Sequence, residues 1–193
     1  FYFLLYFWTL ILGIVCLPYL LLPNSYMRSV ANLWIDGILT LLKFTCGITY
    51  EIRNKENVPN YTAIIASKHQ SAFETLLLFR LINRSIFIHK RELFFIPVFG
   101  LYLKKSNMIA INRNQGTRAM RKMLDEVKQR ILNGYSIIIF PEGTRKKPGE
   151  PPNYKSGVFG IYKESEAEVL PVVVNSGHFW PKHTFVKKDF LRK

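Results

Sequence analysis

Short continuous apolar runs that alternate with helical patterns constrain the fold of this chain more than any other feature. The runs are rich in isoleucine and valine, and they lie at residues 62–67, 85–89, 107–111, 136–140 and 169–175. Helices are expected at 71–81 and at 117–132, where apolar residues recur on one face and Gly134 follows as a cap. Apolar strands separated by helices predict an α/β fold with a largely parallel central sheet flanked by helices.

The N-terminal end of the chain has a different character, because residues 1–22 carry no charge. A helix over this stretch would span about 33 Å, close to the roughly 30 Å hydrocarbon core of a bilayer. Pro18 and Pro23 would kink or end such a helix. Two interpretations stay open: the segment spans the membrane, or it lies as an apolar helix in one leaflet.

A second apolar segment follows and is expected to end at Gly47. It could pair with the first helix as a hairpin or rest on the bilayer surface. We therefore predict a membrane-anchoring helical segment at residues 1–46 and a second domain at residues 47–193. Its apolar stripe at helical spacing consists of Val30, Leu33, Trp34, Ile38, Leu41 and Leu42.

The formal net charge is +14, and the first charged residue is Arg28. A basic body after an apolar anchor predicts that the body lies on the cytoplasmic side of a membrane. Anionic lipid is the favoured partner of the basic surface, and an acidic protein is a second candidate. Nucleic acid is disfavoured, because the basic residues are scattered and no nucleic-acid-binding motif is present.

The cysteines and histidines show no spacing typical of metal ligands. The chain has only two cysteines, Cys16 and Cys46, which offer no disulfide framework and are interpreted as small apolar filler. We therefore expect no metal site.

Polar motifs follow two of the apolar runs, namely 69–74 (His-Gln-Ser-Ala-Phe-Glu) and 140–145 (Phe-Pro-Glu-Gly-Thr-Arg). The carboxyl ends of parallel strands meet at one edge of a sheet, where ligands bind. An imidazole suits the removal of a proton from a hydroxyl group near neutral pH. A carboxylate on its other ring nitrogen would fix the tautomer, as in a Ser-His-Asp triad. The residues expected to share one site at the strand ends are His69, Arg113, Glu142 and Asn175.

Glu74 has two interpretations. Residues 71–74 fit a capping box, with Ser71 as N-cap and Glu74 at the third helical position. Residues five apart on a regular helix lie about 140° apart, so His69 and Glu74 can meet only if His69 precedes the helix. A cap and an orienting partner for the histidine both stay possible.

The second motif predicts an anion-binding turn. Pro141 stops sheet pairing, Gly143 permits a tight turn with exposed N–H groups, and Arg145 can hold a phosphate through two hydrogen bonds. The alternative is an ordinary Pro-Glu-Gly turn without a ligand.

Both motifs, with their surroundings, resemble the glycerolipid acyltransferase family, and more closely its bacterial 1-acylglycerol-3-phosphate acyltransferases. The resemblance covers about residues 48–180, and the family's commoner first motif ends in aspartate where this chain has Glu74. Family members usually continue with a further strand, so the chain is expected to be truncated after residue 193. The matching blocks are Lys68–Ser71 with Glu74, Ile109–Arg113, Phe140–Arg145 and Leu170–Ser176.

The resemblance implies a membrane-bound O-acyltransferase of phospholipid biosynthesis, on the cytoplasmic side of a bacterial inner membrane. It would move a fatty acyl group from acyl carrier protein or coenzyme A to the sn-2 hydroxyl of 1-acylglycerol-3-phosphate, giving phosphatidic acid. His69 would be the general base and Glu74 its orienting partner. The residues implied in binding the acceptor phosphate or shaping its loop are Arg113, Glu142, Gly143, Thr144 and Arg145.

No serine or cysteine motif of an acyl-enzyme is present, so direct transfer without a cofactor beyond the thioester co-substrate is expected. Two alternatives remain. The acceptor could be another lyso-lipid, such as a lyso-ornithine lipid, or the protein could be a non-enzymatic, membrane-tethered basic binding module.

Overall fold

In the computed structural model, which describes residues 1–112 and 116–181, the centre of the protein is a five-stranded parallel sheet of order β3-β2-β4-β1-β5. The strands are β1 (Ile64–Ser67), β2 (Ser85–Lys90), β3 (Ile109–Ile111), β4 (Ser136–Ile139) and β5 (Val169–Val172). All paired neighbours run parallel, which confirms the predicted α/β class. Each strand covers most of its predicted apolar run or extends it by one residue.

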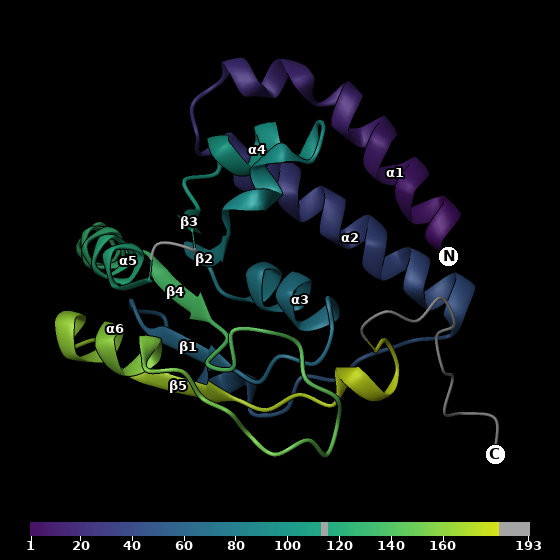
Figure 1. The fold of residues 1–193 in the computed structure, drawn as a ribbon. Helices are drawn as coiled ribbons and strands as arrows, with labels where there is room; N and C mark the ends of the chain where they lie inside the picture. Colours follow the sequence, from purple (N-terminus) through teal and green to yellow (C-terminus); the bar gives the residue numbers. More distant parts are fainter. Residues whose placement is uncertain (113–115, 182–193) are drawn as a thin grey trace.

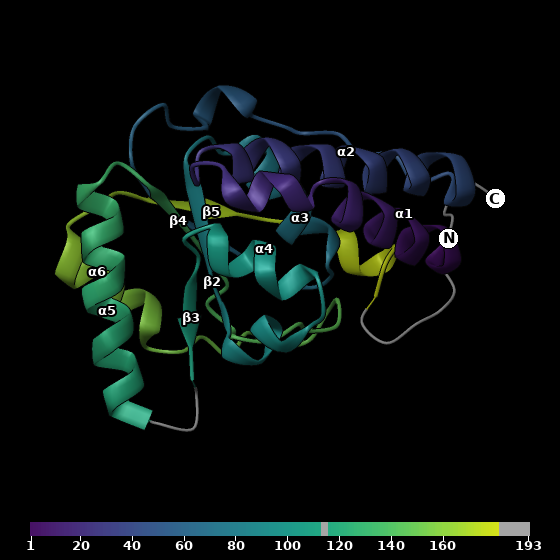
Figure 2. The same cartoon turned by 90° about the horizontal axis from the view of Figure 1, so that it is seen from above.

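Helices cover both faces of the sheet (Figures 1 and 2). One face carries α5 (Gly116–Leu132) and α6 (Gly157–Ser165), and the other carries α3 (Phe73–Leu81) beneath the N-terminal helices. Side chains alternate along the strands, so Ile137 packs with Met123 of α5 while Ile138 packs with Leu78 of α3. This alternation explains why the strands are apolar throughout.

The N-terminal segment forms a helical hairpin of α1 (Tyr2–Val15) and α2 (Tyr26–Cys46). The Trp8 indole N–H donates to the Trp34 carbonyl at 3.1 Å, and the Trp34 indole N–H donates to the Thr9 hydroxyl at 3.0 Å. The pairing of the two segments as a hairpin is therefore confirmed, and contact of the hairpin with a bilayer stays a prediction. The division into an anchoring segment and a catalytic domain stays a prediction.

The break expected at Pro18 is confirmed. The α-helix ends at Val15 with Cys16 as its C-cap, and a 3-10 turn follows at Leu17–Leu21, because Pro18 lacks the N–H that would extend the helical hydrogen bonds. Among the residues that the structure describes, no helix combines the length and the apolar character needed to cross a bilayer. The expected apolar stripe of α2 is also shifted, since Leu33 is 51% exposed while Met27 and Ile35 are buried.

Arg28 of α2 joins the hairpin to α3. Its guanidinium donates to the carbonyls of Phe79 at 2.8 Å and Ile82 at 2.6 Å, at the C-terminal end of α3. These carbonyls have no partner within their own helix, and the negative end of the helix dipole favours a cation there. The hairpin thereby holds the helix that carries Glu74.

The remaining elements are α4 (Phe99–Lys105) and short 3-10 turns at Lys55–Asn57, Arg91–Phe95 and Ser176–His178.

Candidate active site

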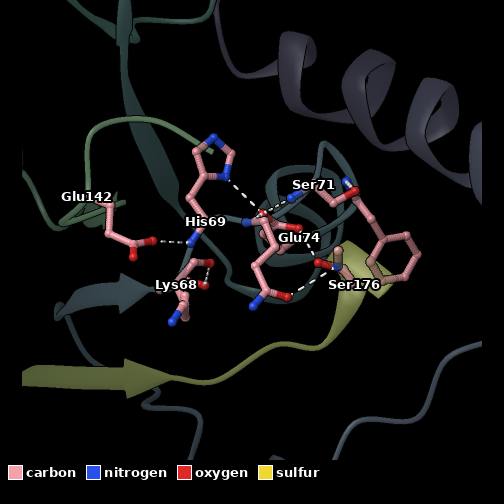
Figure 3. A network of polar contacts seen from close by, with 10 residues as sticks. Lys68, His69, Ser71, Glu74, Glu142 and Ser176 are labelled. Atoms are coloured by element: carbon pink, nitrogen blue, oxygen red, sulfur yellow. Dashed lines mark hydrogen bonds and ion pairs between the residues drawn. The ribbon is translucent and has the colours of Figure 1, made fainter. Parts of the chain in front are cut away.

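His69 lies in the turn between β1 and α3, so it precedes the helix as the pairing with Glu74 requires (Figure 3). Its Nδ1 is 2.8 Å from Glu74 Oε1. An ionised carboxylate can only accept, so Nδ1 donates, and in the neutral imidazole the lone pair then lies on Nε2. The free Nε2 is the atom that a general base needs.

Glu74 is 1% exposed and accepts several hydrogen bonds. Its Oε1 also accepts from the backbone N–H groups of Gln70 and Ser71, both at 2.7 Å, and its Oε2 accepts from the Ser176 hydroxyl at 2.6 Å. Burial alone would raise the pKa of this carboxyl. The hydrogen bonds from His69, Ser176 and the Ser71 N–H outweigh burial and hold the pKa below its ordinary value. Glu74 is therefore an anion.

The capping box is only half formed. Glu74 accepts from the Ser71 N–H, as a box requires, but the Ser71 hydroxyl accepts from the Phe73 N–H at 3.1 Å and not from that of Glu74. The helix begins at Phe73 with Ala72 as N-cap, so the prediction of Ser71 as N-cap is wrong. Glu74 thus combines the two roles that the sequence left open.

The second motif lies directly against the first. The Phe140 ring stacks on the His69 imidazole, with ring centroids 3.9 Å apart. Glu142 is 2% exposed, and its Oε2 accepts from the His69 N–H at 3.3 Å. The Lys146 N–H donates to the His69 carbonyl at 2.8 Å. The histidine turn and the arginine loop are therefore one rigid unit.

The loop itself has the expected tight turn. Gly143 has φ 65°, a left-handed value that favours glycine, and its N–H donates to the Phe140 carbonyl at 2.9 Å. Thr144 is exposed and Arg145 is half-buried. Arg113, the other arginine expected here, lies outside the described residues.

A cavity of about 940 Å³ joins these groups to the N-terminal hairpin. Its polar end is lined by His69, Glu142, Gly143, Thr144 and Arg145, together with Lys155, which the sequence did not single out. Its apolar walls come from the hairpin and α4, with Leu12, Met27, Val30, Trp34 and Tyr102 among them. A cavity that combines these polar groups with apolar walls suits an amphiphilic substrate.

Two further predictions concern Asn175, which was expected to share the site, and the cysteines, which were expected to form neither a disulfide nor a metal site. Asn175 is exposed, and the residue after it, Ser176, is the one that reaches the site. Cys16 and Cys46 are free thiols, and the described parts of the chain contain no cluster of histidine, cysteine and acidic side chains that could hold a metal ion.

A buried histidine–glutamate pair beside an arginine-bearing turn defines an enzyme site that can deprotonate a hydroxyl group next to a bound anion. The sequence profile described as acyltransferase matches residues 49–175. The chain belongs to the acyltransferase family.

Similar proteins include the 1-acyl-sn-glycerol-3-phosphate acyltransferase of Pseudomonas aeruginosa, which is 34% identical over 160 residues, 83% of this chain and 62% of that protein. The human 1-acyl-sn-glycerol-3-phosphate acyltransferase beta is 30% identical over 152 residues, 77% of this chain and 55% of that protein. This chain therefore spans less than two thirds of the length of these relatives. The crystal structure of the 1-acyl-sn-glycerophosphate (LPA) acyltransferase from Thermotoga maritima is similar with a TM-score of 0.66 and 25% identity, over 94% of this chain and 78% of that one.

Proposed function

We propose that this protein transfers a fatty acyl group from a thioester to the sn-2 hydroxyl of 1-acylglycerol-3-phosphate, forming phosphatidic acid. The observation that carries the proposal is the His69–Glu74 pair, which opens into the same cavity as Gly143, Thr144 and Arg145. The names of the similar proteins support the choice of acceptor.

The chemical step follows from the hydrogen bonds of His69. The acceptor hydroxyl gives its proton to Nε2 while its oxygen attacks the thioester carbonyl. The imidazolium that forms is stabilised by the Glu74 anion on Nδ1, 2.8 Å away. When the tetrahedral intermediate collapses, the carbon–sulfur bond breaks and the imidazolium returns the proton to the leaving thiolate. No acyl-enzyme and no cofactor beyond the thioester take part in this proposal.

The acceptor phosphate is assigned to the loop that ends in Arg145. A guanidinium can hold two phosphate oxygens, and Arg145 lines the cavity beside a second cation, Lys155. Because Phe140 stacks on His69 and Lys146 is hydrogen-bonded to it, this loop places a bound phosphate at a fixed position relative to the base. Fixed placement is what makes the sn-2 hydroxyl reactive.

The apolar part of the cavity is assigned to acyl chains. Its walls include Leu12 of α1, Val30 of α2 and Tyr102 of α4, so the hairpin closes the space above the sheet. We propose that the outer face of the hairpin lies in one leaflet of a bacterial inner membrane, with the site on the cytoplasmic side. Its exposed apolar residues include Phe3, Phe7, Leu10, Ile14, Val15 and Leu21.

The donor is proposed to be a thioester of acyl carrier protein or of coenzyme A, and a net charge of +14 suits either acidic partner as well as anionic lipid.

A product assay tests the proposed function. Purified protein is incubated with lysophosphatidic acid or a phosphate-free lyso-ornithine lipid, each with both donors. Formation of phosphatidic acid is expected, and acylation of the ornithine lipid alone would contradict the proposed acceptor.

A further inference from the structure

The 3-10 turn Ser176–His178, which follows β5, contributes a side chain to the histidine–glutamate pair from a distant part of the sequence. The Ser176 hydroxyl donates to Glu74 Oε2 at 2.6 Å, across 102 positions of the chain (Figure 3). Ser176 is 7% exposed and Glu74 is 1% exposed, so water does not compete for this contact. A buried, charge-assisted hydrogen bond of this length is among the stronger ones in proteins.

The two oxygens of Glu74 are held in different ways. Oε1 accepts from His69, Gln70 and Ser71, whereas Oε2 has Ser176 as its donor. The terminal torsion of a glutamate side chain is broad, so a carboxylate held at one oxygen can pivot. A hydroxyl on the second oxygen removes that freedom. It therefore fixes the direction from which the carboxylate meets the imidazole.

The turn that carries Ser176 has no room to move. The Gly177 N–H donates to the Gln70 side-chain oxygen at 3.3 Å, and the Trp180 N–H donates to the Ser176 carbonyl at 2.9 Å. A Cβ added at Gly177 would lie 2.8 Å from Gln70 Cβ and 3.0 Å from Pro148 Cγ. The hydroxyl is thus aimed at Glu74 by packing on both sides.

We propose that Ser176 is a positioning residue for the acyl transfer, acting through Glu74 on His69. The inference rests on the proposed function, because its main effect is read in turnover. Loss of the hydroxyl should lower kcat by about 10-fold or more, the lower end of the range for a hydrogen bond to a charged group. The KM values for acceptor and donor should stay within about twofold, since Ser176 does not line the cavity.

The test is a double-mutant cycle of Ser176→Ala and Glu74→Gln, measured as kcat with lysophosphatidic acid. If Ser176 acts through Glu74, Ser176→Ala should cost much less in the Glu74→Gln background than in the wild type. The matched control is Ser136→Ala, which removes another buried hydroxyl, 4% exposed and hydrogen-bonded to the Ala63 N–H at 3.1 Å, on the opposite end of the sheet. It should leave kcat unchanged.

A second readout needs no turnover. The His69 Nδ1 proton, hydrogen-bonded to Glu74, can be observed by NMR, and its resonance should move in Ser176→Ala but not in Ser136→Ala. An equal loss of kcat in both backgrounds, a rise in KM without a change in kcat, or an unmoved proton resonance would each overturn the inference. Failure of the wild-type protein to acylate lysophosphatidic acid would instead overturn the proposed function, and the resonance would still decide the role of Ser176.

Discussion

At the scale of single residues, the site depends on one buried carboxylate that serves several donors. Glu74 orients the imidazole and also accepts from two backbone N–H groups that precede α3. The pairing of His69 with Glu74 was implied by the family resemblance, whereas the residues alone left a helix cap as an equal alternative, and the structure shows that Glu74, in the first turn of α3, serves both. Ser176 could not be derived this way, since a contact across 102 positions depends on the order of the strands.

Replacement of Glu74 separates its roles. Glutamine keeps a carbonyl oxygen for the backbone N–H groups but has no charge for the imidazolium, so Glu74→Gln should lower kcat by about 10²- to 10⁴-fold. Aspartate keeps the charge but is one methylene shorter, so Glu74→Asp should retain partial activity. Kinetics and urea unfolding of both variants provide the check. Full activity in a folded Glu74→Gln protein would show that the carboxylate is structural only.

Arg145 is expected to act on the acceptor. Loss of a charge-assisted contact worth about 1.5–3 kcal/mol should raise the acceptor KM of Arg145→Ala by roughly 10- to 150-fold, with little change in the donor KM. Arg145→Lys keeps the charge but loses the two-pronged geometry and should recover only part of the loss. The measurement is made at fixed salt and lipid composition. A rise in the donor KM alone would place the thioester, and not the acceptor, at this loop.

At the scale of elements, apolar runs predicted the strands well because a strand buried on both faces has to be apolar throughout. At the N-terminus, the break at Pro18 was predicted correctly, but composition does not show that Trp8 and Trp34 join two helices. The contact between α2 and α3 through Arg28 was also not predicted. Arg28 looked like a flank of the anchor, and it is half-buried against helical carbonyls.

The contribution of Arg28 to the free energy of unfolding can be measured. Arg28→Ala leaves two carbonyls without their charged donor and should lower the free energy of unfolding by about 2–3 kcal/mol. Arg80→Ala is the matched control. Its ion pair with Asp36, at 2.8 Å, is 46% and 49% exposed, and such surface pairs contribute about 0–1 kcal/mol. Urea unfolding gives the free energy of unfolding of both variants, and an equal loss in the two would argue against a special role for Arg28.

At the scale of the whole molecule, one end of the cavity meets the catalytic edge of the sheet and the other meets the helical hairpin. The hairpin also has a broad exposed apolar face, on which Phe3 is 78% and Leu21 is 89% exposed. Exposed apolar area on this scale marks an interaction surface, and a lipid leaflet is the partner that we propose, because the adjoining cavity is proposed to hold acyl chains.

Charge substitutions on that face test the membrane assignment. Phe3→Glu together with Leu10→Glu should weaken binding to anionic liposomes, because each buried apolar side chain contributes about 1.5–3 kcal/mol. Phe159→Glu is the control, since this residue of α6 is 67% exposed on the opposite side of the sheet. High salt should release the double variant more readily than the wild type. Equal liposome binding by all the proteins would refute the hairpin as the docking face.

The most direct test of the account is the kcat of His69→Ala with lysophosphatidic acid, after circular dichroism and urea unfolding have shown that the variant folds. His69 is the imidazole whose Nδ1 is held by Glu74 and whose ring lines the cavity beside Arg145. General-base catalysis contributes about 10²- to 10⁴-fold, so the account predicts a fall in kcat of at least that size. A folded His69→Ala protein that turns over at a near-normal rate would contradict it.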